Sequence, residues 1–344
     1  MLFMKTGNLL NWYRANARTL PWRREPRNPY HVLVSEVMLQ QTQVDRVVPR
    51  FESFIERFPT FEILARASEE EVLEEWSGLG YYRRARTLHS LAKVVMERPG
   101  GLPRTGSELV KLPGIGPYTA AAVASLAFAE AEPVLDGNVM RVGARVLALE
   151  VDTRSAEGRH RLEGWIRGLM DGGPPGQVNE ALMELGATVC DPGRPGCDRC
   201  PLGSGCEATM RGRQGDFPSP RRRRATESLR WVAACAVTAD GEWLVRRVDE
   251  GPILRGLWLP PLLEIEEGAD PAKAVLRLLP IGTMSSPELG DTVRHNITHR
   301  KIDVTPVRVD ADRIEPPSDA WRWVDPKNPG LPTSSLFAKL VGAV

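Results

Sequence analysis

The spacing of apolar residues divides the chain into a helical part and a part rich in strands. Up to about residue 209, apolar side chains recur every three or four residues, with breaks at proline and glycine, which is typical of amphipathic helices. This spacing predicts helices at 30–41, 49–58, 69–77, 83–97, 106–112, 117–129, 139–149, 156–170 and 177–190. We therefore expect an all-α architecture for this part of the chain.

The later part of the chain has short runs of β-branched and aromatic residues, which are typical of strands. These runs predict strands at 230–238, 242–247, 304–309 and 322–324, with a helix near 271–279. Between the two parts, prolines accompany several arginines, including the run 221–224, so we expect an extended basic linker that is either solvated or in contact with phosphates. The chain is predicted to be multidomain: an all-α region at 1–210, a linker at 211–228 and an α+β domain at 229–344.

Composition agrees with two globular domains and narrows the function little. The chain has 344 residues, of which 42% are hydrophobic and 26% charged. The net charge is +1, so binding to nucleic acid would have to rest on local basic patches. The apolar run 119–129 is too short to span a bilayer, and the N-terminal residues lack the apolar core of a signal peptide. We expect a cytoplasmic protein without a membrane anchor.

Four of the five cysteines form a compact cluster, Cys190, Cys197, Cys200 and Cys206, separated by six, two and five residues. The intervening residues are rich in glycine and proline, which allow the chain to turn tightly around one centre. Four thiolates suit either a zinc ion or an iron–sulfur cluster, and chemistry alone does not decide between them. Two disulfides are the structural alternative, which a reducing compartment disfavours.

A glycine-rich turn lies in the segment 112–118, Leu-Pro-Gly-Ile-Gly-Pro-Tyr. Pro117 suits the first position of a helix, and a helix N-terminus with free backbone N–H groups is a phosphate-binding feature. Gly114 and Gly116 would permit close approach of a phosphate backbone on either side of Ile115. By itself, the motif equally fits an ordinary turn between two helices.

Two acidic residues differ in the surroundings that the sequence predicts for them. Glu36 lies in the apolar helix 32–39, where burial should raise its pKa. Asp136 directly precedes the helix 139–149, where N–H donors and the helix dipole favour the anion, although an ordinary N-cap is the alternative. One protonated and one ionised carboxyl group would provide a proton donor and a stabiliser of positive charge.

These motifs, in this order, resemble the helix-hairpin-helix DNA glycosylase superfamily that carries a 4Fe-4S cluster. The segments 35–43, Ser-Glu-Val-Met-Leu-Gln-Gln-Thr-Gln, and 78–86, Gly-Leu-Gly-Tyr-Tyr-Arg-Arg-Ala-Arg, resemble its adenine-specific branch, the MutY glycosylases. The resemblance covers residues 8–210 with strong motifs and implies that the four cysteines hold a 4Fe-4S cluster rather than zinc. It also implies that Gly114, Ile115 and Gly116 bind the DNA backbone.

The resemblance further implies roles for individual residues. Glu36 would protonate adenine, and Asp136 would stabilise or capture the sugar cation, assisted by Tyr118 and Asn138. Residues expected around the flipped adenine or the lesion are Arg18, Trp22, Arg23, Glu180, Gln41, Thr42 and Tyr81. Arg83, Arg84 and Arg86 would contact phosphates.

The C-terminal part resembles the Nudix-like lesion-recognition domain of the same family, with weaker motifs. The turn 256–260, Gly-Leu-Trp-Leu-Pro, and the loop 295–299, His-Asn-Ile-Thr-His, carry this likeness, which implies that Thr298 and His299 read 8-oxoguanine. Many relatives have Phe and Ser where this chain has Ile297 and Thr298, which puts the strength of that contact in doubt. The segment 272–279 lacks the acidic cluster of a Nudix hydrolase, so we expect no nucleotide hydrolysis.

The sequence leaves three functions to distinguish. The resemblance favours a monofunctional adenine glycosylase acting on duplex DNA with 8-oxoguanine:A or G:A mispairs, and we expect it to be a monomer. A bifunctional glycosylase–lyase of the endonuclease III type would carry a lysine where this chain has Tyr118. A non-catalytic iron–sulfur damage sensor would not need both Glu36 and Asp136.

Overall fold

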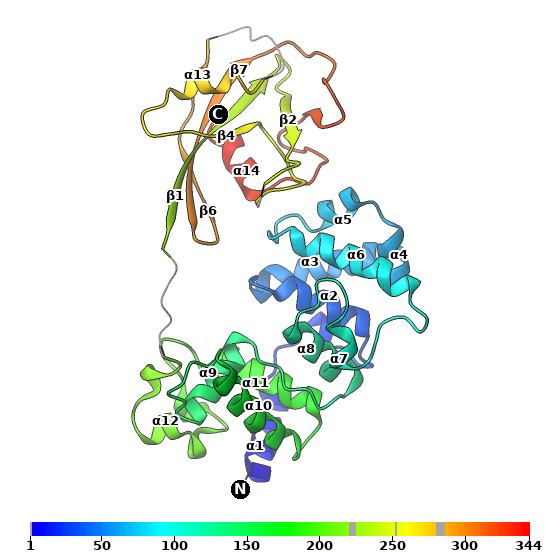
Figure 1. The fold of residues 1–344 in the computed structure, drawn as a ribbon, viewed down its shortest axis with the longest axis vertical. Helices are drawn as coiled ribbons and strands as arrows, with labels where there is room; N and C mark the ends of the chain where they lie inside the picture. Colours follow the sequence, from blue (N-terminus) through cyan, green and yellow to red (C-terminus); the bar gives the residue numbers. More distant parts are fainter. Residues whose placement is uncertain (1, 220–224, 252, 280–285) are drawn as a thin grey trace. The chain divides into compact units, whose positions relative to one another are not determined.

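The computed structural model describes residues 2–219, 225–251, 253–279 and 286–344, and contacts between Cα atoms divide the chain into two compact units. The first unit comprises Met1–Arg66 and Thr87–Arg222, and the second comprises Ala67–Arg86 and Arg223–Val344 (Figure 1). The division between the two units falls within the arginine run 221–224 of the expected linker. This run lies outside the described residues.

Helices and short 3-10 turns form the described part of the first unit, together with α6, which continues into it from the second. They are α1 (Leu2–Asn16), η1 (Pro21–Arg23), α2 (Pro29–Leu39), α3 (Val44–Arg57), α4 (Phe61–Arg66), α6 (Arg83–Glu97), α7 (Gly106–Leu109), α8 (Pro117–Phe128), α9 (Gly137–Val146), α10 (Ala156–Met170), α11 (Pro175–Thr188), η2 (Cys197–Arg199), η3 (Gly203–Gly205), α12 (Glu207–Met210) and η4 (Gln214–Asp216). The all-α prediction for this part of the chain is confirmed.

The N-terminal helix α1 packs against helices that lie far from it in the sequence. Leu9 of α1 is fully buried with Ile166 of α10 and Leu182 of α11 in one apolar core, and Thr6 donates a hydrogen bond to the Leu169 carbonyl at 3.0 Å. Burying a large aliphatic side chain stabilises a fold by about 1.5–3 kcal/mol. This packing brings the residues that follow α1 next to α11 (Figure 1).

The start of α3 differs from the prediction. The helix begins at Val44 rather than at residue 49, and Pro49 lies inside it. Proline inside a helix removes one backbone hydrogen bond, so Pro49 suggested the first residue of a helix rather than an interior one. The predicted start of this helix is therefore five residues too late. The apolar residues Val47, Phe51 and Phe54 of this helix are buried, and their packing outweighs the cost of the proline.

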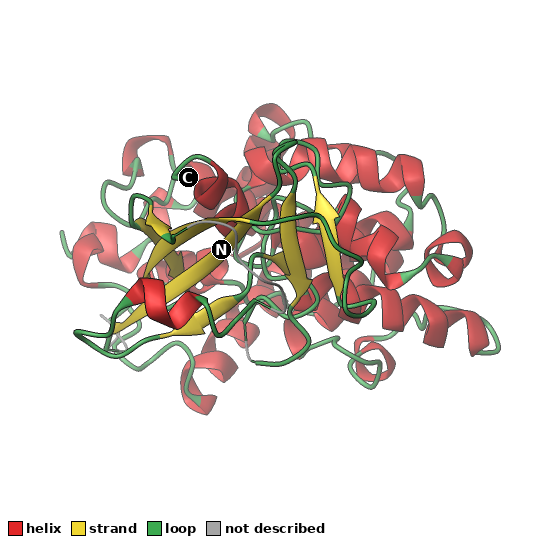
Figure 2. Cartoon of the chain, turned by 90° about the horizontal axis from the view of Figure 1, so that it is seen from above, coloured by secondary structure: helices red, strands yellow, loops and turns green. Residues whose placement is uncertain are grey.

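The described part of the second unit contains a mixed sheet and four helical segments, with the strands drawn in yellow in Figure 2. Its elements are α5 (Glu69–Glu75), the first residues of α6, β1 (Glu227–Val237), β2 (Trp243–Arg247), β3 (Trp258–Leu259), β4 (Leu262–Glu264), α13 (Pro271–Val275), β5 (Glu288–Leu289), β6 (Val293–Ile297), β7 (Arg300–Asp310), β8 (Trp321–Val324) and α14 (Ser335–Val341). The α+β prediction for the C-terminal part is confirmed.

The long strands β1 and β7 form the centre of this sheet. They pair in parallel along their whole length, from Glu227 opposite Arg300 to Val237 opposite Asp310. The other pairings in the described residues are antiparallel, and the main strand order is β3-β2-β1-β7-β5, with β4 on β1, β6 on β7 and β8 on β2. The sequence did not predict β3, β4, β5 or β6. The first three have only two or three residues, which give too short a pattern to detect, and β6, Val-Arg-His-Asn-Ile, has polar residues at its three central positions.

Within the described ranges, no helix is both long and apolar enough to cross a membrane.

Candidate functional site

The first unit contains a cavity of about 740 Å³, and acidic side chains from two parts of the chain line it. One is α2 with the residues after it, and the other comprises the start of α9 and the inner face of α11. Its wall includes most residues that the sequence predicted for chemistry and base recognition: Arg18, Trp22, Arg23, Glu36, Gln41, Thr42, Tyr118, Asp136, Asn138 and Glu180. The fold therefore assembles in one place residues spread over nearly half of the sequence.

Glu36 lies on α2 among apolar side chains. Asn28 caps this helix by accepting a hydrogen bond from the Tyr30 N–H, and Pro29 occupies its first turn. Glu36 is 3% exposed, and burial raises the pKa of its carboxyl group to about 7. The group can therefore carry a proton near neutral pH, as the apolar pattern of the helix predicted.

Tyr118 is the direct partner of Glu36. It lies in the first turn of α8, and its hydroxyl donates a hydrogen bond to Glu36 Oε2 over 2.6 Å. This bond lowers the pKa of Glu36, whereas burial and the nearby Asp136 raise it, and burial has the largest effect. Burial likewise raises the pKa of Tyr118 well above 10, so the phenol stays protonated and acts as a donor.

Asp136 is the N-cap of α9, as predicted. It accepts hydrogen bonds from the Val139 N–H at 2.6 Å and from Asn138 Nδ2 at 3.1 Å. Burial nevertheless raises the pKa of Asp136 above its usual value. The donors offset this effect but do not outweigh it.

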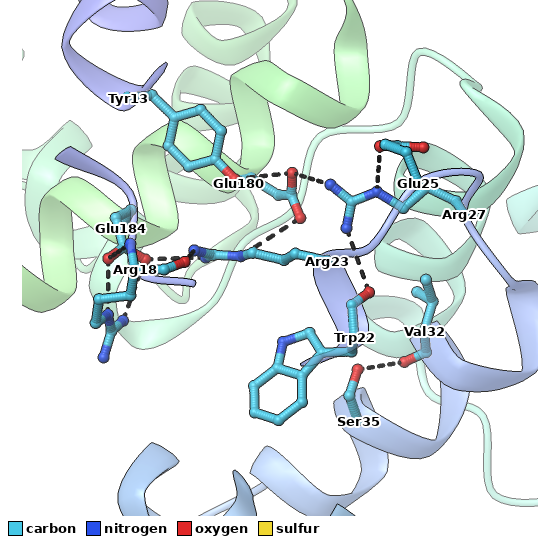
Figure 3. A network of polar contacts seen from close by, with 10 residues as sticks. All are labelled: Tyr13, Arg18, Trp22, Arg23, Glu25, Arg27, Val32, Ser35, Glu180 and Glu184. Atoms are coloured by element: carbon cyan, nitrogen blue, oxygen red, sulfur yellow. Dashed lines mark hydrogen bonds and ion pairs between the residues drawn. The ribbon is translucent and has the colours of Figure 1, made fainter. Parts of the chain in front are cut away.

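A network of buried ion pairs forms the other side of the cavity (Figure 3). Glu180 contacts Arg27 at 2.8 Å and Arg23 at 3.6 Å, and it accepts a hydrogen bond from the Tyr13 hydroxyl at 3.0 Å. Glu184, one helical turn further along α11, contacts Arg18 at 2.7 Å and Arg23 at 2.9 Å.

Three members of this network were not predicted from the sequence: Tyr13, Arg27 and Glu184. Glu184 lies four residues after Glu180 in an apolar helix, so both carboxylates share one helix face. That spacing was a usable signal for Glu184. Arg27 and Tyr13 gave no comparable signal, because only the folded chain brings them to α11.

Trp22 forms part of the cavity wall and is 7% exposed. Its ring packs edge-on against Phe51 of α3, with 5.2 Å between the ring centres. Gln41 follows α2 with a positive φ of 61°, and Thr42 comes directly after it. The three side chains therefore line the cavity from the α2–α3 side.

The predicted glycine-rich turn joins α7 to α8. Gly114 has a φ of 73°, and a Cβ atom there would lie 1.7 Å from Thr87 Cγ2, so both conformation and space require glycine. A Cβ at Gly116 would meet nothing within 4 Å, which leaves the N-terminus of α8 open to a ligand. Ile115 is buried and anchors the turn.

The four clustered cysteines occupy the loop after α11, and none forms a disulfide. Hydrogen bonds reach two of the sulfur atoms, from Arg145 to Cys190 Sγ at 3.3 Å and from Thr209 to Cys197 Sγ at 3.7 Å. Donors directed at sulfur fit thiolate ligands, so the donor set is compatible with an iron–sulfur cluster. In the described part of the chain, however, no three acidic, cysteine or histidine side chains are arranged to hold a metal ion.

Two arginines of α9 link this loop to the cavity wall. Arg141 donates to Asn138 Oδ1 and to the Cys190 carbonyl, each at 2.8 Å. Arg145 is 3% exposed and donates to the Asp191 carbonyl at 2.7 Å, among other loop carbonyls. The sequence reasoning did not identify either arginine.

The remaining predicted residues belong to the second unit. Tyr81 has a positive φ of 49°, is 43% exposed, and lies 5.4 Å from the guanidinium of Arg84. Arg84 is only 9% exposed and donates to the carbonyls of Leu79 and Gly80, which does not suit the phosphate contact expected of it. Its interaction with the tyrosine ring indicates a local structural role.

Thr298 and His299 form the tight turn between β6 and β7. Thr298 has a φ of 56°, and its hydroxyl lies 3.2 Å from His299 Nδ1. Glu227 at the start of β1 lies 3.7 Å from His299 Nε2 and pairs with Arg300 at 2.7 Å. The turn is therefore held from both sides while its side chains remain accessible.

Comparison with known families gives the class of this protein. Residues 34–167 match the HhH-GPD superfamily of base excision DNA repair proteins, and residues 232–343 match the NUDIX domain. The solved structure of a thermostable thymine-DNA glycosylase is similar, with a TM-score of 0.55 and 29% identity over 60% of this chain and 95% of that one. The fold is thus that of a helix-hairpin-helix DNA glycosylase.

Individual relatives narrow the class to a family. The adenine DNA glycosylase of Rattus norvegicus is 38% identical over 86% of this chain and 68% of its own length. The human enzyme of the same name is 49% identical over 60% of this chain and 39% of its own length, and that of Mycolicibacterium smegmatis is 44% identical over 61% and 70%. The chain belongs to the adenine DNA glycosylase family, also called MutY.

Proposed function

We propose that this protein excises adenine from duplex DNA where adenine is mispaired with 8-oxoguanine or guanine. The observation that carries the proposal is one cavity lined by both Glu36 and Asp136, of which Glu36 is buried and has a pKa of about 7. A volume of about 740 Å³ is large enough to admit a flipped nucleotide. The adenine DNA glycosylases among its relatives supply the choice of adenine.

In the proposed reaction, the protonated carboxyl of Glu36 donates its proton to N7 of adenine. The bond between C1′ and N9 then breaks, and its electron pair leaves with the base. Tyr118 donates to Glu36 Oε2, so it fixes which oxygen is free to face the base. A general acid with a pKa near 7 balances proton availability against acid strength at neutral pH.

Asp136 would stabilise the positive charge that develops on the sugar. Its backbone donor at 2.6 Å and its contact with Asn138 hold the carboxylate in one orientation before the charge appears, which is what electrostatic stabilisation requires. Glu36, now ionised, would take a proton from the attacking water as the water oxygen bonds to C1′. This step restores the starting protonation state.

Two further parts of the molecule would hold the DNA and the cofactor. The turn with Gly114, Ile115 and Gly116 would bind backbone phosphate at the N-terminus of α8. Cys190, Cys197, Cys200 and Cys206 would hold a 4Fe-4S cluster, which when bound cross-links the loop after α11.

Recognition of the mispair would involve both units. Trp22, Arg18, Arg23 and Glu180 would surround the adenine, and Gln41 and Thr42 border the same cavity. Tyr81, Thr298 and His299 would contact the opposite base. We propose that the protein acts as a monomer.

One assay tests this function against a glycosylase–lyase and a non-catalytic sensor. Excess protein is incubated with a duplex containing one 8-oxoguanine:A pair, and strand breaks are counted with and without hot alkali. We expect breaks at the adenine only after alkali, because Tyr118 stands where a lyase would need an amine nucleophile. Breaks without alkali would indicate a lyase, and no breaks would overturn catalysis altogether.

A further inference from the structure

Glu184 is the most completely enclosed carboxylate of the cavity wall, with a side chain that is 0% exposed. It accepts four hydrogen bonds from two arginines. Arg18 supplies its backbone N–H at 3.2 Å, Nε at 2.7 Å and Nη2 at 3.2 Å, and Arg23 supplies Nη2 at 2.9 Å (Figure 3). Among the described residues, no other carboxylate in this wall accepts as many hydrogen bonds.

The geometry on Arg18 is that of a fork. Nε meets one carboxylate oxygen of Glu184 and Nη2 meets the other, so the plane of the guanidinium is fixed relative to the carboxylate. The backbone N–H of the same residue meets the first oxygen as well. A long side chain with many rotamers is therefore restricted to one orientation.

This fork leaves one donor of Arg18 available. Across the described residues, Nη1 of Arg18 makes no hydrogen bond, and the Arg18 side chain is 39% exposed at the cavity wall. Arg23 differs, because its Nη1 donates to the Arg18 carbonyl at 3.2 Å and its Nε lies 3.6 Å from Glu180. Arg18 is thus the arginine whose free end can reach a ligand.

We propose that Glu184 is a positioning residue, which orients Arg18 so that its free Nη1 donates to an acceptor nitrogen on the edge of a purine in the cavity. This inference rests on the proposed function. Ring nitrogens of adenine are acceptors, so a fixed donor both holds the base and selects it. Glu184 does not touch the base and acts through Arg18, because Arg23, which it also contacts, is held by Glu180 and the Arg18 carbonyl as well.

Single-turnover base release from the 8-oxoguanine:A duplex tests the inference by a double-mutant cycle. Glu184→Gln keeps the size of the side chain but removes its charge, and Arg18→Ala removes the group through which it is proposed to act. We expect E184Q to lower the rate on the order of 100-fold in the native background, because a misplaced group has an effect of that size. In the R18A background, the same substitution should change the rate by less than about threefold.

Two further measurements separate positioning from a purely structural role. Binding to an undamaged duplex should be unchanged in E184Q, because only the extruded base meets Arg18. Glu184→Asp keeps the charge and should therefore recover part of the rate that E184Q loses. If E184Q does not fold, E184D takes its place in the double-mutant cycle. Glu132→Gln is the matched control, because Glu132 pairs with Arg167 at 3.7 Å on the surface, and it should behave as the native protein.

The outcomes are distinct. Equal losses from the Glu184 substitution in both backgrounds, or no loss in the native one, would overturn the inference while leaving the proposed function intact. If the native protein releases no adenine at all, the proposed function is wrong, and the inference that rests on it is overturned with it.

Discussion

The two pairs of buried carboxyl groups in one cavity differ in what surrounds them. The hydrogen-bond partners of Glu36 and Asp136 are a phenol, a backbone N–H and an amide, and burial raises the pKa of both carboxyl groups. Glu180 and Glu184 face three guanidinium groups. Although burial alone would raise the pKa of Glu184, its arginines lower it below the usual value.

Two buried carboxyl groups, Glu36 and Glu184, thus have pKa values shifted in opposite directions. Where no guanidinium pairs with a carboxyl group, desolvation favours the neutral acid, which can donate a proton. Where cations form ion pairs, the carboxylate stays charged and serves as a fixed acceptor that orients them. Under the proposed function, the cavity wall would contain a reacting pair of carboxyl groups on one side and an orienting pair on the other.

The largest expected effect is that of Glu36→Gln on chemistry. The amide cannot donate an acidic proton, so single-turnover adenine release should fall by at least about 10²–10⁴-fold. DNA binding, measured by a gel-shift titration, should persist. A rate within tenfold of the native value would remove Glu36 from its assigned role.

Asp136→Asn should have the next largest effect. The amide keeps the shape of the N-cap but provides no negative charge, so we expect a loss of about 10²–10³-fold in the rate of base release. Circular dichroism should show the same helix content as the native protein. An unchanged rate would mean that the charge on the sugar is stabilised by another group.

The same Glu36→Gln variant should alter stability in a pH-dependent way. Because the pKa of Glu36 is raised from 4.5 to about 7 in the folded protein, its stabilising contribution is complete below pH 4.5 and is lost as the pH rises through 7. At about pH 8, E36Q should be more stable than the native protein by about 3 kcal/mol, since each pKa unit corresponds to about 1.4 kcal/mol. Urea unfolding at several pH values measures this difference, which should vanish near pH 4.5; a constant difference would contradict it.

The smallest effect is expected in the second unit. His299→Ala should weaken binding to the 8-oxoguanine:A duplex by about three- to tenfold, because it removes one exposed hydrogen-bonding group. Binding to an undamaged duplex should not change. Equal weakening on both duplexes would show that His299 contacts the DNA without reading the lesion.

The sequence was informative wherever one local pattern determines the structure. The apolar run around Glu36 predicted both its helix and its raised pKa, and the position of Asp136 before α9 predicted its N-cap hydrogen bond. The orienting side of the cavity was predicted only in part. Tyr13 and Arg27 both reach Glu180 of α11 only in the folded chain, and contacts between residues 167 and 153 positions apart leave no periodic signal.

Titration of the Glu36 carboxyl group in the free protein tests directly whether this residue can donate a proton at neutral pH. Carbon-13 NMR of the protein labelled at the glutamate side chains, with E36Q to assign the signal, gives the midpoint. We expect the Glu36 carboxyl group to titrate with a midpoint near pH 7. A midpoint near the usual value of 4.5 would show that Glu36 is ionised at neutral pH and would contradict its role as the proton donor.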